Sequence, residues 1–294
     1  MNRIEFLEKW ELDFLVEKQK SFVKNTSRPY ADDCYIETPF YVTVNTKSNI
    51  PLGTVKSRYT VLNNHEILDK VLNALPEDSY NLEESVGGVF QNGKKVYMFI
   101  KMTKPEPLAF ANDTMDCYVY ALSSHDASQR LVLGVTTKMH SCSNMFSLLM
   151  SDKDNNFVLK HTDHIQNNQA SYILNLVNRN FKGVYKMLET LANTPSNSAL
   201  VDLILDVVAK QGERQSSLKE EKREALLSSI HEEIAAKGNT LYGVFNGLTH
   251  YLSHKHGEFT SHCNYYDMVS GDSHKFVEKG LDVLLREVNR LNPN

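Results

Sequence analysis

The sequence is poor in the features that mark fibrous, secreted and membrane-spanning proteins. Its 294 residues include only 13 glycines and 8 prolines, too few for a collagen-like or linker-dominated chain. No stretch approaches about 18 consecutive apolar residues, so we expect no transmembrane helix. Residues 1–9 lack a cationic segment followed by an apolar run, so we expect no secretory signal. These absences predict a globular protein.

Cysteine is scarce, and neither sign of charge is in large excess. The cysteines are scattered and include no CxxC pair: Cys34, Cys117, Cys142 and Cys263. This spacing predicts neither a disulfide framework nor a cysteine-rich zinc site, and we expect a reducing, cytoplasmic compartment. The 36 acidic and 32 basic residues give a formal net charge of −4. This balance argues against a globally basic nucleic-acid-binding surface but is compatible with a local basic patch.

Hydrophobic periodicity divides the chain into two parts. Before about residue 165, apolar and polar residues alternate in several segments, which is typical of strands. Asn92-Gly93 lies between two such segments, Val86–Phe90 and Lys94–Met102, and predicts an antiparallel hairpin. After that point the apolar residues recur with a period of about 3.6, as in helices. We therefore predict an α+β fold, with an antiparallel β-rich domain over residues 1–165 and a helical region over residues 166–294.

The first 25 residues are the predicted exception within the β-rich part. Ile4, Leu7, Trp10 and Phe14 recur at helical spacing, which predicts a helix over Met1–Asn25. Its broad apolar stripe is too large for a lone surface helix, so we expect it to pack on its own chain or on a neighbouring subunit.

The segment from Lys94 to Lys104 carries the strongest functional pattern. Alternate residues of a strand share a face, and one face here is plainly apolar, with Met98 and Ile100 among its members. The other face combines two aromatic rings with two lysines. Such a face suits single-stranded nucleic acid, because bases stack on rings and phosphates meet cations.

Neighbouring strands carry similar residues, and together they form a predicted DNA-binding face. In this hypothesis four rings stack on bases: Tyr97, Phe99, Tyr118 and Tyr120. Six cations meet phosphates: Lys56, Arg58, Lys95, Lys101, Arg130 and Lys138. The alternative interpretation is that helices cover this face and that the aromatic side chains are buried.

Two other clusters of residues suggest a metal site or a catalytic triad, but each has a simpler structural explanation. His250 and His254 lie one helical turn apart, a spacing at which two histidines can share a metal ion, but no nearby carboxylate has a suitable register. We favour exposed or polar-packed histidines there. Ser124-His125-Asp126-Ala127-Ser128 contains residues of a hydrolytic triad, but three adjacent residues rarely aim at one atom. A structural turn is the default interpretation.

The order of motifs resembles a family of phage- and plasmid-related proteins of unknown function. The resemblance covers roughly residues 50–256 and rests on these segments: Ile50–Gly53 with Arg58–Asn64, Gly87-Gly88 with Gly93-Lys94, Ser124–Ser128, Cys142–Met145, His161-Thr162, and Asn239-Thr240 with Thr249–Tyr251 and His254. Ala127 departs from the pattern, because the family usually has glycine there. This departure predicts a different conformation of the turn after Asp126.

The resemblance implies a phage or plasmid setting and no established enzymatic activity. Within the family, the chain is most similar to single-stranded DNA-binding proteins of lytic phages that package their own RNA polymerase. We therefore expect a non-enzymatic, sequence-tolerant protein that binds single-stranded DNA during phage replication or transcription in the bacterial host cytoplasm, without a cofactor or metal. Because the net charge is negative, we expect a homo-oligomer or cooperative assembly on the strand.

Two rival hypotheses come from other classes of protein. The first is an adaptor that binds a phage RNA polymerase, or another replication or transcription protein, through its helical half. The second is a metal-dependent enzyme that uses the C-terminal histidines.

Overall fold

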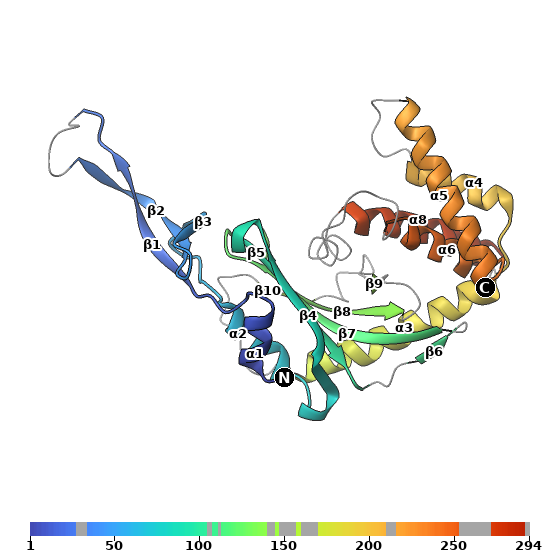
Figure 1. Ribbon diagram of the computed structural model, residues 1–294, viewed down its shortest axis with the longest axis horizontal. Helices are drawn as coiled ribbons and strands as arrows, with labels where there is room; N and C mark the ends of the chain where they lie inside the picture. The colour runs from blue at the N-terminus through green and yellow to red at the C-terminus, as the bar shows by residue number, and fades with distance from the viewer. Residues whose placement is uncertain are drawn as a thin grey trace. The chain divides into compact units, whose positions relative to one another are not determined.

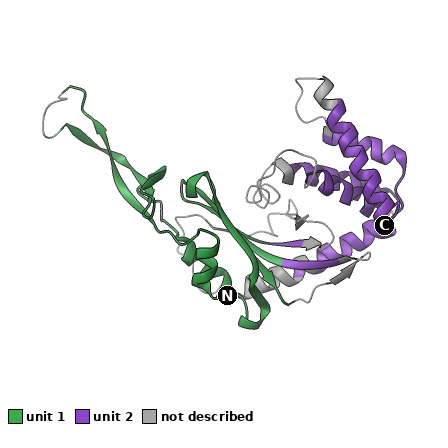
Figure 2. Cartoon of the chain, viewed as in Figure 1, with its two compact units in different colours: residues 1–104, 118–134, 156–176 green, residues 105–117, 135–155, 177–294 purple. Residues whose placement is uncertain are grey.

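The fold is α+β, as predicted. The computed structural model describes residues 1–27, 34–104, 108–110, 113–139, 145–146, 157–159, 170–209, 216–252 and 272–291 (Figure 1). Antiparallel strands dominate the first half of the chain and helices the second. The chain forms two compact units: residues 1–104, 118–134 and 156–176, and residues 105–117, 135–155 and 177–294 (Figure 2). The predicted boundary between residues 165 and 166 lies outside the described residues.

The helix predicted over Met1–Asn25 is wrong beyond its first two turns. Helix α1 (Arg3–Lys9) begins with a capping box, in which Asn2 and Glu5 exchange hydrogen bonds, and it ends at Trp10. From there the burial alternates: Leu12, Phe14 and Val16 are buried, whereas the residues between them are exposed. Burial with period two belongs to an extended chain, so the segment leads into strand β1 (Val16–Lys24).

Strand β1 is the edge of a three-stranded antiparallel sheet. The order is β1, then β2 (Tyr35–Asn45), then β3 (Ile50–Lys56). Pairing of β2 with β3 ends where Phe40 lies opposite Lys56, whereas β1 stays paired with β2 as far as Tyr35. Beyond β3, the two strands therefore continue as a two-stranded ribbon, drawn in blue in Figure 1. We call residues 18–24 and 35–41, which form this ribbon and the adjoining end of the three-stranded sheet, the arm.

The second sheet has seven strands. Five of its strands lie side by side in the order β10 (Phe157–Leu159), β8 (Leu131–Met139), β7 (Asp113–Ser124), β5 (Lys95–Met102) and β4 (Tyr80–Phe90). The two short strands pair outside this order: β6 (Leu108–Phe110) pairs with β7, and β9 (Met145–Phe146) pairs with β8. The predicted hairpin is confirmed. The turn between β4 and β5 places Gln91, Asn92 and Gly93 at φ values of 49°, 59° and 92°, which an Asn-Gly pair tolerates well.

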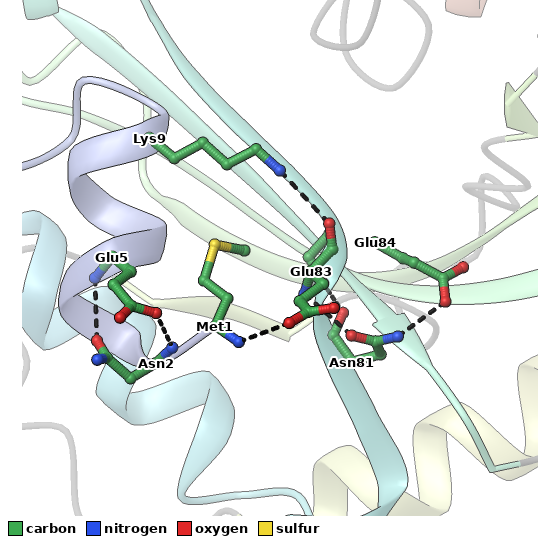
Figure 3. A network of polar contacts seen from close by, with 8 residues as sticks. Met1, Asn2, Glu5, Lys9, Asn81, Glu83 and Glu84 are labelled. Carbon is green, nitrogen blue, oxygen red and sulfur yellow. Dashed lines mark hydrogen bonds and ion pairs between the residues drawn. The ribbon is translucent and has the colours of Figure 1, made fainter.

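Helix α1 packs against β4 at the edge of this sheet. The terminal ammonium of Met1 forms an ion pair with Glu83 at 3.0 Å, and Lys9 Nζ donates to the Glu83 carbonyl at 3.4 Å (Figure 3). Gly87 lies beneath this contact, where a Cβ atom would come within 2.9 Å of Leu12 and 3.3 Å of Phe6. Helix α2 (Asn64–Leu72) contributes a second apolar layer to the same unit.

The described residues of the C-terminal half form the helices α3 (Ala170–Asn193), α4 (Ser198–Ala209), α5 (Ser216–Lys237), α6 (Leu241–His250) and α8 (Asp272–Leu291). Nearly all of α6 is buried. Its Gly247 faces Ile230 of α5 so closely that a Cβ atom would overlap the Ile230 backbone. None of the described helices is long and apolar enough to cross a membrane.

Candidate nucleic-acid interface

The register of the seven-stranded sheet gathers the predicted aromatic residues on one face. Phe99 lies opposite Tyr120, and Lys101 lies opposite Tyr118. Opposed residues of antiparallel strands point to the same side, and Tyr97 is two residues from Phe99. The ring centroids of Tyr97 and Phe99 are 5.9 Å apart, and those of Phe99 and Tyr120 are 5.8 Å apart.

These rings are buried, so the predicted stacking platform on this face is wrong in this structure. Tyr97, Phe99 and Tyr120 are 0% exposed, and Tyr118 is 4% exposed. Tyr97 lies across Gly88 of the neighbouring strand, where a Cβ atom would be 2.5 Å from the tyrosine oxygen. A glycine there makes room for the ring to lie on the sheet. Burial also raises the pKa of Tyr120, as expected for a phenol without water. The alternative interpretation, buried aromatics, is the correct one.

The six predicted cations are divided among different elements. Lys56, Arg58 and Arg130 are exposed. Lys95 and Lys101 are half-buried, and Lys101 forms an ion pair with Glu84. The side chain of Lys138 lies outside the described residues. Lys56 is the last residue of β3 and Arg58 lies in the turn that follows, whereas Lys95 and Lys101 lie on β5 of the other sheet. The set is therefore not one strip along a single sheet.

The turn from Ser124 to Ser128 joins elements rather than presenting reactive groups. The imidazole of His125 is buried, and its Nε2 lies 3.0 Å from Asn64 Oδ1. Because the Asn64 amide nitrogen donates to Leu12, that oxygen must accept, and Nε2 therefore carries the proton. Thr43 Oγ1 donates to the His125 carbonyl at 2.7 Å, which links the turn to the three-stranded sheet.

Two further features of this turn bear on the sequence predictions. Partial burial opposes the ionisation of Asp126, but hydrogen bonds from Ser128 and Ser124 outweigh it and lower the pKa of Asp126. Ala127 has φ of 62°, the left-handed conformation that glycine adopts readily. Alanine thus adopts a backbone conformation that glycine takes up more easily, at a steric cost. The predicted difference from the turn of the family stays a prediction.

The C-terminal histidines provide no metal site among the described residues. His250 Nδ1 lies 2.8 Å from a carboxylate oxygen of Glu233, on the neighbouring helix α5. No group of three potential ligands occurs in the described part of the chain, and His254 lies outside it. The histidine is packed against a polar partner, which is the interpretation that the sequence favoured.

The arm carries a combination of lysines and aromatic rings like the one that the sequence predicts as a DNA-binding face on β5. Lys18, Lys20, Phe22 and Lys24 alternate along β1 and share one face. Across from them on β2, Tyr41 lies opposite Lys20 and Tyr35 opposite Lys24. Phe22 is 54% exposed and Tyr35 is 63% exposed. We call these six residues the lysine–aromatic face.

Two of the three lysines of this face, Lys18 and Lys20, have contacts within the protein. Lys18 Nζ donates to the carbonyls of Ser57 and Tyr59, at 2.8 and 2.9 Å, and lies 4.9 Å from the centre of the Tyr41 ring. Lys20 forms an ion pair with Glu37 at 2.9 Å, and that hydrogen-bonded carboxylate raises the pKa of Lys20. The alternation of these residues was visible in the sequence, but the helix predicted over the first 25 residues concealed it.

Comparison with known proteins identifies the family of the chain. Residues 51–284 match the family model described as Domain of unknown function (DUF932). The chain belongs to the DUF932 family. No curated protein and no solved structure matches it. The DUF932 match begins within β3, so β1 and β2, and with them the arm, precede the matched residues. The lysine–aromatic face is therefore outside the matched DUF932 segment.

Proposed function

We propose that this protein is a non-enzymatic, sequence-tolerant single-stranded DNA-binding protein. The observation that supports this proposal is the lysine–aromatic face of the arm. Its exposed rings, Phe22 and Tyr35, offer surfaces on which unpaired bases stack, and its lysines neutralise phosphates between them. Stacking requires bases with free faces, which duplex DNA does not supply along its length.

The motif resemblance supports the setting of this activity. The order of the motifs resembles that of Drc, a single-stranded DNA-binding protein of lytic phages that package their own RNA polymerase. We propose a role in phage DNA replication or transcription in the bacterial host cytoplasm, with the phage RNA polymerase as a candidate partner. The motifs that carry this resemblance begin at Ile50, so they are independent of the arm.

Net charge favours binding by several subunits rather than one. The chain has a formal charge of −4 at pH 7, so a single copy is repelled by DNA outside its local contact. Neighbouring copies on one strand add their lysine–aromatic faces, and cooperative binding of this kind is common among single-stranded DNA-binding proteins.

The decisive experiment measures binding of the full-length chain to a labelled oligothymidylate across a salt series. Phe22→Ala or Tyr35→Ala should cost about 1–3 kcal/mol for each base that loses its stacking partner and should leave the salt dependence nearly unchanged. Lys24→Ala should reduce the slope of log affinity against log salt by about 0.7. Lys104→Ala is the matched control, because Lys104 is exposed and lies outside the arm.

Three results would contradict the proposal. One is the absence of oligothymidylate binding at low salt. Another is an equal loss of affinity in Lys104→Ala and Lys24→Ala. The third is equal affinity for duplex and single-stranded DNA, since that would indicate phosphate contacts without stacking.

A further inference from the structure

Helix α3 carries a row of cations on its exposed side. Arg179, Lys182 and Lys186 are all exposed, whereas Val184 and Leu188 are buried. The three cations are three and four residues apart, so they follow one side of the helix over two turns. Seven residues of α-helix rise about 10 Å, which is the length of this row along the helix axis. We call these three residues the basic row.

The lysines of the basic row are not balanced by carboxylates. Positions three and four residues from Lys182 hold no acidic residue, and Glu189, three residues beyond Lys186, forms no ion pair with it. Neither lysine has an ion-pair partner among the described residues. Lys47 and Asp13, by contrast, pair at 2.6 Å. Like charges one turn apart repel each other, so the row costs helix stability unless an anion binds there.

The helix surface between these cations is open. Gly183 is four residues from Arg179 and three from Lys186, and no atom of another element lies within 4 Å of its Cβ position. The exposed residues of α3 from 182 to 193 include no large apolar side chain. A protein partner buries apolar surface at the core of its interface, where lysine is depleted. Charge without apolar surface suits the phosphate backbone of a nucleic acid instead.

We propose that the basic row is a second contact for the phosphate backbone of single-stranded DNA. This inference rests on the proposed function and adds phosphate contacts without stacking to those of the arm. Lysine meets a phosphate as a point charge, so the contact tolerates any sequence. The two contacts belong to different compact units, because the arm lies within residues 1–104 and the row within residues 177–294 (Figure 2).

The basic row and the arm also differ in their relation to the DUF932 match. The row lies within residues 51–284, whereas the arm precedes them. In this proposal the matched segment therefore has a DNA contact of its own. Phe22→Ala combined with Tyr35→Ala should remove stacking from the arm, and the binding that remains should depend on salt because it consists of phosphate contacts.

The test measures the affinity of the full-length chain for an oligothymidylate of about 60 nucleotides across a salt series. Lys182→Gln and Lys186→Gln should each weaken binding about fivefold at low salt. The slope of log affinity against log salt should fall by about 0.7 for each variant and by about 1.4 for the double variant. Lys279→Gln is the matched control and should have little effect, because Lys279 is exposed on α8 with Glu278 and Asp282 nearby in the helix.

Thermal melting separates the loss of a phosphate contact from the loss of structure. Glutamine forms helices about as well as lysine, and removing one of two like charges relieves repulsion, so neither variant should melt at a lower temperature. An unchanged salt slope in the double variant would overturn the inference, as would an equal effect of Lys279→Gln. If the arm variants weaken binding and the double variant does not, the proposed function stands and only the second contact is wrong. A wild-type protein that binds no oligothymidylate would overturn both.

Discussion

Ala127 illustrates how a single residue can hold an unfavourable conformation. Its φ of 62° places the Cβ atom against the backbone, at a cost that glycine does not incur. The surrounding turn maintains this geometry, because Ser128 donates to Asp126 at 2.9 Å and the Ser124 hydroxyl bonds Gln129. The strain is therefore local and removable.

Ala127→Gly should stabilise the protein by about 1 kcal/mol, because it relieves the left-handed strain and alters no other contact. Chemical denaturation measures this difference. Ala235→Gly is the control of opposite sign, since Ala235 is exposed within helix α5 and glycine should cost about 1 kcal/mol there. Equal effects of the two substitutions would contradict the assignment of strain to residue 127.

Glu37 is the acidic residue that engages the lysine–aromatic face. Glu37→Gln removes a negative charge opposite Phe22 and releases Lys20 for phosphate. Affinity for oligothymidylate at low salt should rise about fivefold, since a charge pair at about 4 Å in water is worth about 1 kcal/mol. Glu83→Gln, remote from the arm on β4, should have little effect. A lower affinity for Glu37→Gln would mean that this face does not meet phosphate.

At the scale of elements, strand burial separates two aromatic rows that look alike in sequence. Phe99→Ala should lower the free energy of unfolding by about 3–5 kcal/mol, because the ring is fully buried on β5. Phe22→Ala should change stability by only about 0.5 kcal/mol and should instead weaken DNA binding, because its ring is exposed on the arm. Melting curves and binding isotherms on both variants test this. Weaker DNA binding in Phe99→Ala, together with a large loss of stability in Phe22→Ala, would indicate that the binding site lies on β5.

The close contact between α5 and α6 depends on Gly247, which has no side chain. Gly247→Ala should destabilise the protein by about 1–3 kcal/mol, because the new methyl group would overlap the Ile230 backbone. Gly183→Ala on α3 is the matched control, since no atom lies within 4 Å of its Cβ position. It should stabilise the protein by up to about 1 kcal/mol. Denaturant titration distinguishes the two, and a neutral Gly247→Ala would show that the helices can separate without cost.

At the scale of the whole molecule, net charge opposes DNA binding at neutral pH. The sequence isoelectric point is about 6.3, so the chain becomes positive below that pH. Lowering the pH from 7.5 to 5.5 should therefore raise the affinity for oligothymidylate about tenfold at low salt. The same change should have much less effect at about 0.5 M salt, where long-range charge is screened. An equal rise at both salt concentrations would implicate local protonation instead of net charge.

The sequence alone determined the features that depend on neighbouring residues. The α+β class, the hairpin at Asn92-Gly93 and the C-terminal helices all follow from local periodicity and from the backbone freedom of a turn. The shared face of Tyr97 and Phe99 was likewise predictable, because alternation along a strand is a property of the backbone.

Tertiary structure decided which faces are exposed and how the first 25 residues fold. Both the β5 segment and the β1 segment combine lysines with aromatic residues, but Tyr97 and Phe99 on β5 are buried, whereas Phe22 on β1 is exposed. After α1, the chain has apolar residues compatible with either period, and the burial of Leu12, Phe14 and Val16 within their own compact unit selects the extended form. Burial depends on contacts between residues far apart in the chain, which no local pattern encodes.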